Sequence, residues 1–294
     1  MFTRLLLSLS LALTFLGPLI APAAAESSPA AYITEVTLTG QDRTEGTAIR
    51  REGALLRPRL LMALYAGDEI VLREAASRIV IETEGGSEQV VTGAQAVHKV
   101  MGDIAADDGL WGLLDAVADA IGGGSDEAVP DNMMTRDDGK GLRIPMAANG
   151  ANHLVRSNSP VWIAWSGGAA PFRVTVSAGE EVKVIEGITG HEANVSVPPA
   201  AASRFRVKVE DAGGRTDTIL FRLRDERPEP PRGATEQARG LASDLAYAAW
   251  LTGLEDGSWT IGAARMLTEQ SGSGGAASLL RERIAAGWKL PAGD

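Results

Sequence analysis

Cysteine is absent from this chain of 294 residues. Its absence excludes disulfide bonds, thiol nucleophiles, thiolate zinc sites and iron–sulfur clusters, so packed apolar cores must supply the stability. Histidine is scarce as well. His98, His153 and His191 lie in different segments, and no two have the i, i+4 spacing of a helical metal site. The sequence therefore predicts no metal site and no cofactor.

Basic charge is also in short supply, with 28 Lys and Arg against 38 Asp and Glu and a formal net charge of −10 at pH 7. Binding to a phosphate backbone needs a basic surface, so nucleic acid is not an expected partner. The Gly-rich segments 122–125 and 271–278 lack the Gly-Lys-Ser/Thr ending of a phosphate-binding loop, and we interpret them as linkers.

Long apolar runs are missing except at the N-terminus, where LLLSLSLALTFLGPLI follows the positive Arg4 and small residues follow it up to Ala25. This pattern is typical of a secretory signal peptide, predicted at 1–25, with an uncleaved membrane anchor as the alternative. No other run approaches the ~18 apolar residues of a membrane span. We therefore expect export to the periplasm and no membrane-spanning segment after cleavage.

Two changes in composition divide the remaining chain. The Gly- and Asp-rich stretch 122–141 indicates a flexible linker, and three prolines in 225–233 indicate a semi-rigid one. The expected fold is mainly β with a C-terminal α module. Its parts are a small β-domain at 31–100, an amphipathic helix at 101–121, the linker at 122–141, an immunoglobulin-like β-sandwich at 142–224, the Pro-rich linker at 225–233 and a short helical bundle at 234–290.

The β regions follow from alternation and turn residues. YITEVTLT and SRIVIET alternate in the first domain and glycines separate its strands, which predicts a small antiparallel barrel or sandwich. The second domain has seven strand candidates in fewer than a hundred residues, which is typical of an immunoglobulin-like sandwich. They are NHLVR, PVWIAWS, FRVTVS, EVKVIEG, EANVSV, RFRVKVE and TDTILFRL.

Helical spacing of apolar residues appears in two places. The helix before the linker either covers an edge of the first β-domain or presents Trp111 to a partner. The tail predicts three short helices separated by turns, which form a small bundle or a solenoid-like cap.

Candidate chemistry is sparse. Gly67-Asp68 lies between two apolar segments and predicts a turn rather than a catalytic site. The acidic segments 137–141, 210–214 and 255–259 do not fit the calcium loop of an EF-hand, so we expect structural roles for them. No G-x-S-x-G motif is present, and a Ser-His-Asp triad would have to assemble from distant residues. We assign no catalytic residue and do not expect an enzyme.

Five tryptophans are the candidate interface residues: Trp111, Trp162, Trp165, Trp250 and Trp259. Strand alternation places Trp162 and Trp165 on opposite faces, so at most one of them faces the sandwich core. The other is expected to anchor a partner or to be covered by a neighbouring domain.

The first β-domain resembles the FecR-like domain over about residues 31–96. The resemblance lies in the order V-x-L-x-G from Val36, A-I-R-R-E-G from Ala48, L-x-x-G-D-x-I from Leu64, S-x-I-x-I from Ser77, and Gly86-Ser87. Gly85 stands where the family usually has aspartate. The family's regulators also use a cytoplasmic segment and a transmembrane helix, a pattern not seen here, so we do not expect that signalling role. The resemblance implies a small periplasmic β-domain for protein or cell-wall contacts.

These observations together predict an exported, non-enzymatic scaffold that binds envelope proteins through its β-domains and helical tail. One alternative is a module that binds peptidoglycan or another glycan, which would expose aromatic side chains together on one sheet face. A further alternative is a hydrolase with a dispersed site. That function requires a cleft holding His153 or His191 within hydrogen-bond reach of a carboxylate and a Ser hydroxyl.

Overall fold

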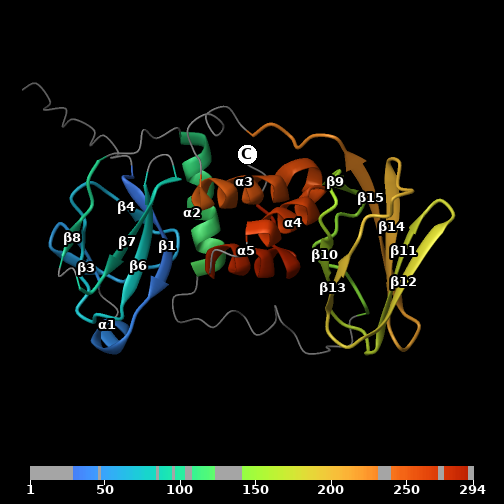
Figure 1. The fold of residues 1–294 in the computed structure, drawn as a ribbon, viewed down its shortest axis with the longest axis horizontal. Helices are drawn as coiled ribbons and strands as arrows, with labels where there is room; N and C mark the ends of the chain where they lie inside the picture. The colour runs from blue at the N-terminus through green and yellow to red at the C-terminus, as the bar shows by residue number, and fades with distance from the viewer. Residues whose placement is uncertain are drawn as a thin grey trace, which may run out of the picture.

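A computed structural model describes residues 29–45, 48–83, 86–94, 97–102, 108–122, 141–230, 240–270 and 275–290. The chain is mainly β with a C-terminal helical segment. Figure 1 shows an N-terminal β unit at one end, a β-sandwich at the other, and helices packed between them. The predicted signal peptide and most of the 122–141 linker lie outside the described residues. Within the described ranges, no helix is both long and apolar enough to cross a membrane.

The N-terminal β unit is built from two four-stranded antiparallel sheets, which agrees with the predicted barrel or sandwich. Their strand orders are β4-β1-β6-β7 and β3-β2-β5-β8. The elements are β1 (Ala31–Thr37), α1 (Gly40–Glu45), β2 (Ile49–Arg51), β3 (Ala54–Leu56), β4 (Ala63–Leu64), β5 (Glu69–Ile70), β6 (Arg78–Thr83), β7 (Glu88–Thr92) and β8 (His98–Lys99). Alternating residues such as Ile33, Ile79 and Ile81 point into the core between the sheets.

Strand β1 is buried on both of its faces. Its first four residues are all buried, and its pairing with β6 shifts by one residue between Ile33 and Glu35. Ile33 belongs to the core of the β unit, whereas Tyr32 belongs to a second core that continues into the helices. The β unit therefore has an apolar outer face that its own residues do not cover.

Gly67-Asp68 forms the predicted turn, and Asp68 has a structural partner that sequence patterns did not reveal. Gly67 has a φ of +96°, and the amide of Asp68 donates to the carbonyl of Tyr65. The buried Asp68 carboxylate accepts two-pronged hydrogen bonds from Arg51, the closest 2.7 Å long, and one from the Tyr65 amide. These bonds hold the end of β2 against the turn that precedes β5.

All seven predicted strands of the sandwich are confirmed. They are β9 (Ala151–Val155), β10 (Val161–Ala164), β11 (Phe172–Ala178), β12 (Glu181–Ile188), β13 (Glu192–Val195), β14 (Arg204–Glu210) and β15 (Thr216–Arg224). A five-stranded sheet of order β12-β11-β14-β15-β9 faces the pair β10-β13, and β9 runs parallel to β15. This division into two packed sheets is that of an immunoglobulin-like sandwich.

The sandwich core is aromatic and needs no disulfide. Phe205 and Phe221 pair across β14 and β15 with ring centroids 4.7 Å apart, and Phe172 packs edge-on to Trp165 at 5.3 Å. All three phenylalanines are at most 2% exposed. Their burial supplies the apolar contacts that a cysteine-free sandwich requires.

The predicted tail of three helices is confirmed, and the earlier amphipathic helix joins it. The elements are α2 (Asp108–Gly122), α3 (Leu241–Gly253), the 3₁₀ turn η2 (Leu254–Gly257), α4 (Thr260–Gln270) and α5 (Gly275–Ala285). Helix α2 packs mainly on α3 and α5, and its buried Leu114 and Val117 belong to the core of the helices. It lies on the side of the helices nearest the N-terminal β unit (Figure 1), and its role as a cover for an edge of that unit stays a prediction. The four helices form one helical module.

The helical module is a wedge that contacts both β regions. Helices α3 and α5 pack on β1, and α4 packs on β9 and β10. One buried cluster runs without a break from Tyr32 and Leu61, through Leu245 and Leu280, to Trp162 of the sandwich. The division into separate units connected by linkers is therefore incomplete, because the units share one core.

Gly262 allows α4 to approach β9 closely. A Cβ atom at this position would lie 3.1 Å from the backbone carbonyl oxygen of His153, which cannot move without disturbing the sheet. We expect Gly262→Val to lower the free energy of unfolding by about 1–3 kcal/mol through overpacking, measured by chemical denaturation. Gly275→Val is the matched control, because its Cβ meets only a Leu60 side chain at 3.4 Å. Equal effects of the two substitutions would contradict this account.

Candidate functional site

The structure buries most of the candidate interface tryptophans inside the molecule. Trp162, Trp165 and Trp259 are 4–6% exposed, so they are not surface anchors, because the wedge and the sandwich core cover them. Trp250 is partly buried and stacks on Tyr247 with ring centroids 5.7 Å apart. Trp111 belongs to α2, but its side chain lies outside the described part of the structure.

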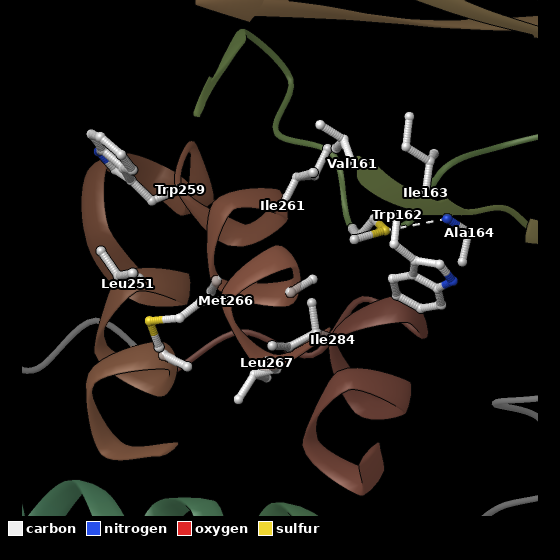
Figure 2. Close-up of a cluster of buried hydrophobic side chains, with 14 of the residues drawn as sticks. Val161, Trp162, Ile163, Ala164, Leu251, Trp259, Ile261, Met266, Leu267 and Ile284 are labelled. Atoms are coloured by element: carbon white, nitrogen blue, oxygen red, sulfur yellow. Dashed lines mark hydrogen bonds between the residues drawn. The ribbon is translucent and has the colours of Figure 1, made fainter. Parts of the chain in front are cut away.

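Trp162 occupies the junction between the sandwich and the helical module. Figure 2 shows its indole beside Ile284 of α5, on the side of β10 that faces the helices. Its Nε1 donates to Glu192 at 3.1 Å, and the Arg281 guanidinium lies 5.0 Å from the ring centroid. Trp165 packs instead against Phe172 of the sandwich core. The expected division therefore holds, with one tryptophan in the core and the other covered by a neighbouring unit.

A polar pocket opens at this same junction, on the side where β9 and β15 meet η2 and the C-terminal segment. Its volume is about 610 Å³, which is in the usual range for small-molecule sites. The polar side chains lining it include His153, Arg222, Glu255, Asp256, Ser258 and Lys289. They come from four regions that are more than thirty residues apart in sequence.

His153 is the buried polar group of this pocket. Its Nε2 lies 3.2 Å from an Arg224 guanidinium nitrogen, and because arginine only donates, Nε2 accepts and Nδ1 carries the proton in the neutral ring. Burial and the Arg224 charge lower the pKa of His153, and the nearby Glu255 only partly opposes this effect. Nδ1 is 3.2 Å from Glu255 Oε2, yet the angles do not make a hydrogen bond, so this buried donor is unpaired.

The loop that supplies Glu255 and Asp256 has unusual backbone geometry. Both residues have positive φ, 48° and 58°, in the left-handed region that non-glycine residues seldom adopt. Such conformations cost of order 1–3 kcal/mol each and cluster at ligand clamps and active sites. The Ser258 hydroxyl donates to Glu255 Oε2 at 3.2 Å, and the Ser258 carbonyl accepts from the His153 amide at 2.6 Å. The loop is thereby held against β9.

The pocket meets only part of the requirement that we set for a hydrolase. A cleft does hold His153 and a serine near one carboxylate, but both contact Glu255 rather than each other. Nucleophilic catalysis needs the histidine hydrogen-bonded to the serine so that it can remove the proton. Here His153 Nε2 is occupied by Arg224, and Ser258 is already bonded to the acid. The geometry is not that of a Ser-His-carboxylate triad.

Of the other acidic segments, 210–214 lies apart from the pocket. Asp211 in segment 210–214 accepts hydrogen bonds from the amides of Ala169, Gly213 and Arg215 and from the Arg215 side chain, so it organises a hairpin as expected. Burial opposes its ionisation, but the bonds from Arg215 and Ala169 hold its pKa below the usual range. Segment 137–141 lies almost wholly outside the described residues. Within the described ranges, no group of three His, Asp or Glu is placed to hold a metal ion.

Sequence patterns missed the pocket because its parts are individually ordinary. Glu255-Asp256-Gly257 has the composition of a common turn, and Arg222 is one of several outward-facing residues of β15. The one sequence signal for the pocket was the strand alternation of β15. This alternation places Arg222 and Arg224 on one face of the sheet, and the pairing of β15 with β9 puts His153 on the same face.

Comparison with known proteins does not assign this chain to a family. No family model matches the chain, and no curated protein matches it. Among solved structures, the chain is similar to Sidekick-1 immunoglobulin domains 1–5, at 13% sequence identity and a TM-score of 0.20. The match covers 67% of this chain and 38% of that one, so this chain spans well under half of the other's length. At that TM-score the immunoglobulin-like assignment rests on the strand order described above.

Proposed function

We propose that this protein is an exported, non-enzymatic scaffold of the cell envelope that holds two β surfaces in a fixed relative orientation and binds envelope proteins through them. The observation that carries the proposal is the single buried core that runs from Tyr32 and Leu61 through the helices to Trp162. A flexible linker would be enough to tether the two β units to each other. A helical module whose apolar core contacts both units instead fixes the angle and the distance between them.

Among the described residues, the large exposed apolar side chains lie in or beside the β regions rather than on the helices. Val182 and Val184 on β12 are 58% and 46% exposed, and β12 is the edge strand of the five-stranded sheet. Leu55 on β3, also an edge strand, is 52% exposed. Edge strands with exposed apolar side chains are common protein-binding elements. The two edges belong to β units on opposite sides of the wedge (Figure 1).

The experiment that tests the scaffold places a photo-cross-linking amino acid at position 55 or position 184 of the full-length chain in intact cells. A truncation before the helices is unsuitable, because it would expose the core around Trp162 and Tyr32. We expect discrete protein adducts from both positions and none from the control position 225, whose side chain is 90% exposed but projects from a loop. A chain that forms no protein adduct at either edge and sediments with purified peptidoglycan would replace the scaffold with the glycan-binding alternative.

A further inference from the structure

The charged groups around the junction pocket balance each other. Arg222 and Lys289 contribute two positive charges, Glu255 and Asp256 contribute two negative ones, and His153 is neutral. A ligand with only negative charge would be repelled by the two carboxylates, and one with only positive charge by the two cations. The lining therefore favours a ligand with zero net charge that carries one group of each sign.

Arg222 is poorly accommodated by the protein alone. It stands directly opposite Arg204 in the β14–β15 pairing, and like charges at opposed positions of a sheet destabilise it. Within the described residues, no carboxylate forms an ion pair with Arg222. On its other side, Arg222 is paired with His153 of β9. A bound carboxylate would relieve this unfavourable arrangement.

His153 gives a second and independent indication of a ligand. Its Nδ1–H is a donor on a side chain that is 7% exposed, it faces the pocket residue Glu255, and it has no hydrogen bond. A buried donor without a partner has lost its hydrogen bond to water, and an acceptor oxygen of a ligand would restore one. The strained left-handed residues Glu255 and Asp256 form the wall beside it.

Lys289 is held at the acidic loop, where its Nζ donates to the Asp256 carbonyl at 3.4 Å, so Arg222 is the cation left for a ligand. We propose that the junction pocket binds a short zwitterionic peptide, with its carboxylate at Arg222, its ammonium group at Glu255 and Asp256, and a backbone carbonyl accepting from His153 Nδ1. A peptide supplies an acceptor between its charged ends, which a free amino acid lacks. The volume of about 610 Å³ suits a ligand larger than one amino acid. This binding site is independent of the envelope partners proposed above.

Calorimetric titration of the full-length mature chain with alanylalanine tests the proposal. The two control ligands are N-acetyl-alanylalanine, which lacks the ammonium group, and alanylalanine amide, which lacks the carboxylate. We expect alanylalanine to bind and each capped form to bind at least about tenfold more weakly, since each loses a charge-assisted contact. Equal affinity of the three ligands, or no binding of alanylalanine up to about 10 mM, would overturn the proposal.

Two matched variants distinguish an effect on ligand binding in the pocket from an effect on the sheet. Arg222→Ala and Arg204→Ala both remove the same opposed pair of arginines, but only Arg222 lines the pocket. We expect Arg222→Ala to weaken alanylalanine binding about tenfold or more and Arg204→Ala to change it less than about twofold. Because both side chains are exposed on one sheet face, both variants should fold. An equal loss in the two variants would show that the sheet, and not the pocket, sets the affinity.

Discussion

Trp162→Ala is expected to lower the free energy of unfolding by about 3–5 kcal/mol, because it opens a cavity in the core that joins the sandwich to the wedge. The indole is 6% exposed, and its removal also deprives Glu192 of a donor and Arg281 of an aromatic surface. Figure 2 shows apolar side chains of α4 and α5 on the helical side of Trp162, including Ile261 and Ile284.

Chemical denaturation followed by both far-ultraviolet circular dichroism and tryptophan fluorescence measures this effect. A shared core requires that the helices and the sandwich unfold together, so the two signals should move in parallel in the variant. Val184→Ala is the control, because it removes an apolar side chain that is 46% exposed, and it should change the stability by less than about 0.5 kcal/mol. A loss below about 1 kcal/mol for Trp162→Ala, or a helical transition unaffected by it, would contradict the single core.

Glu82→Gln is expected to make the protein more stable above neutral pH and to reduce its sensitivity to pH. Glu82 of β6 is 5% exposed and accepts a hydrogen bond from the Ala242 amide at the N-terminus of α3. Burial raises its pKa from 4.5 to about 7, against the opposing bonds from the amides of Ala242 and Leu241, and the charges of Glu88 and Asp244 raise it further. The ionised form is thus disfavoured in the folded state.

The sign of the pH dependence follows from this raised pKa. The folded protein holds the proton between pH 4.5 and about 7 while the unfolded chain releases it. The contribution of Glu82 to stability is therefore greatest below pH 4.5 and is lost as the pH rises to about 7. At 1.36 kcal/mol per pKa unit, the loss amounts to about 3 kcal/mol at most. Glutamine cannot ionise and still offers an oxygen to the Ala242 amide.

Urea denaturation at pH 5 and pH 8 compares wild type with Glu82→Gln. We expect the difference in stability between the two pH values to shrink in the variant, leaving a smaller part from Asp244, whose pKa burial also raises. Glu88→Gln is the control, since it alters a neighbouring exposed charge and keeps the buried carboxyl. The assignment to Glu82 fails when both variants show the wild-type dependence on pH.

Local patterns in the sequence predicted the strands and helices well, because each depends on neighbouring residues. The alternation in FRVTVS and RFRVKVE appears directly as β11 and β14, with Val174 and Val207 buried between the sheets. The turn at Gly67-Asp68 followed from the same local chemistry. The FecR-like resemblance of this region remains a prediction.

Contacts between distant segments were not predictable, because nothing in one segment marks its partner. Glu82 and Ala242 are 160 residues apart, and neither has an unusual local context. Likewise, Trp162 and Trp259 look like surface anchors in isolation and are buried only because the helices return to the sandwich. The pocket was not predictable for the same reason. His153 and Arg222 of the sandwich meet Glu255 only when the helical module packs against the sandwich.

The two-sided burial of β1 also constrains the order in which the molecule can form. Synthesis proceeds from the N-terminus and domains generally fold as units as they emerge. The N-terminal β unit can close its own core early, but the outer face around Tyr32 and Leu61 is covered by α3 and α5, which begin only at Leu241 and Gly275. The nascent β unit therefore displays this apolar patch until α3 and α5 have been synthesised, and in that interval the patch is open to the aggregation that chaperones prevent.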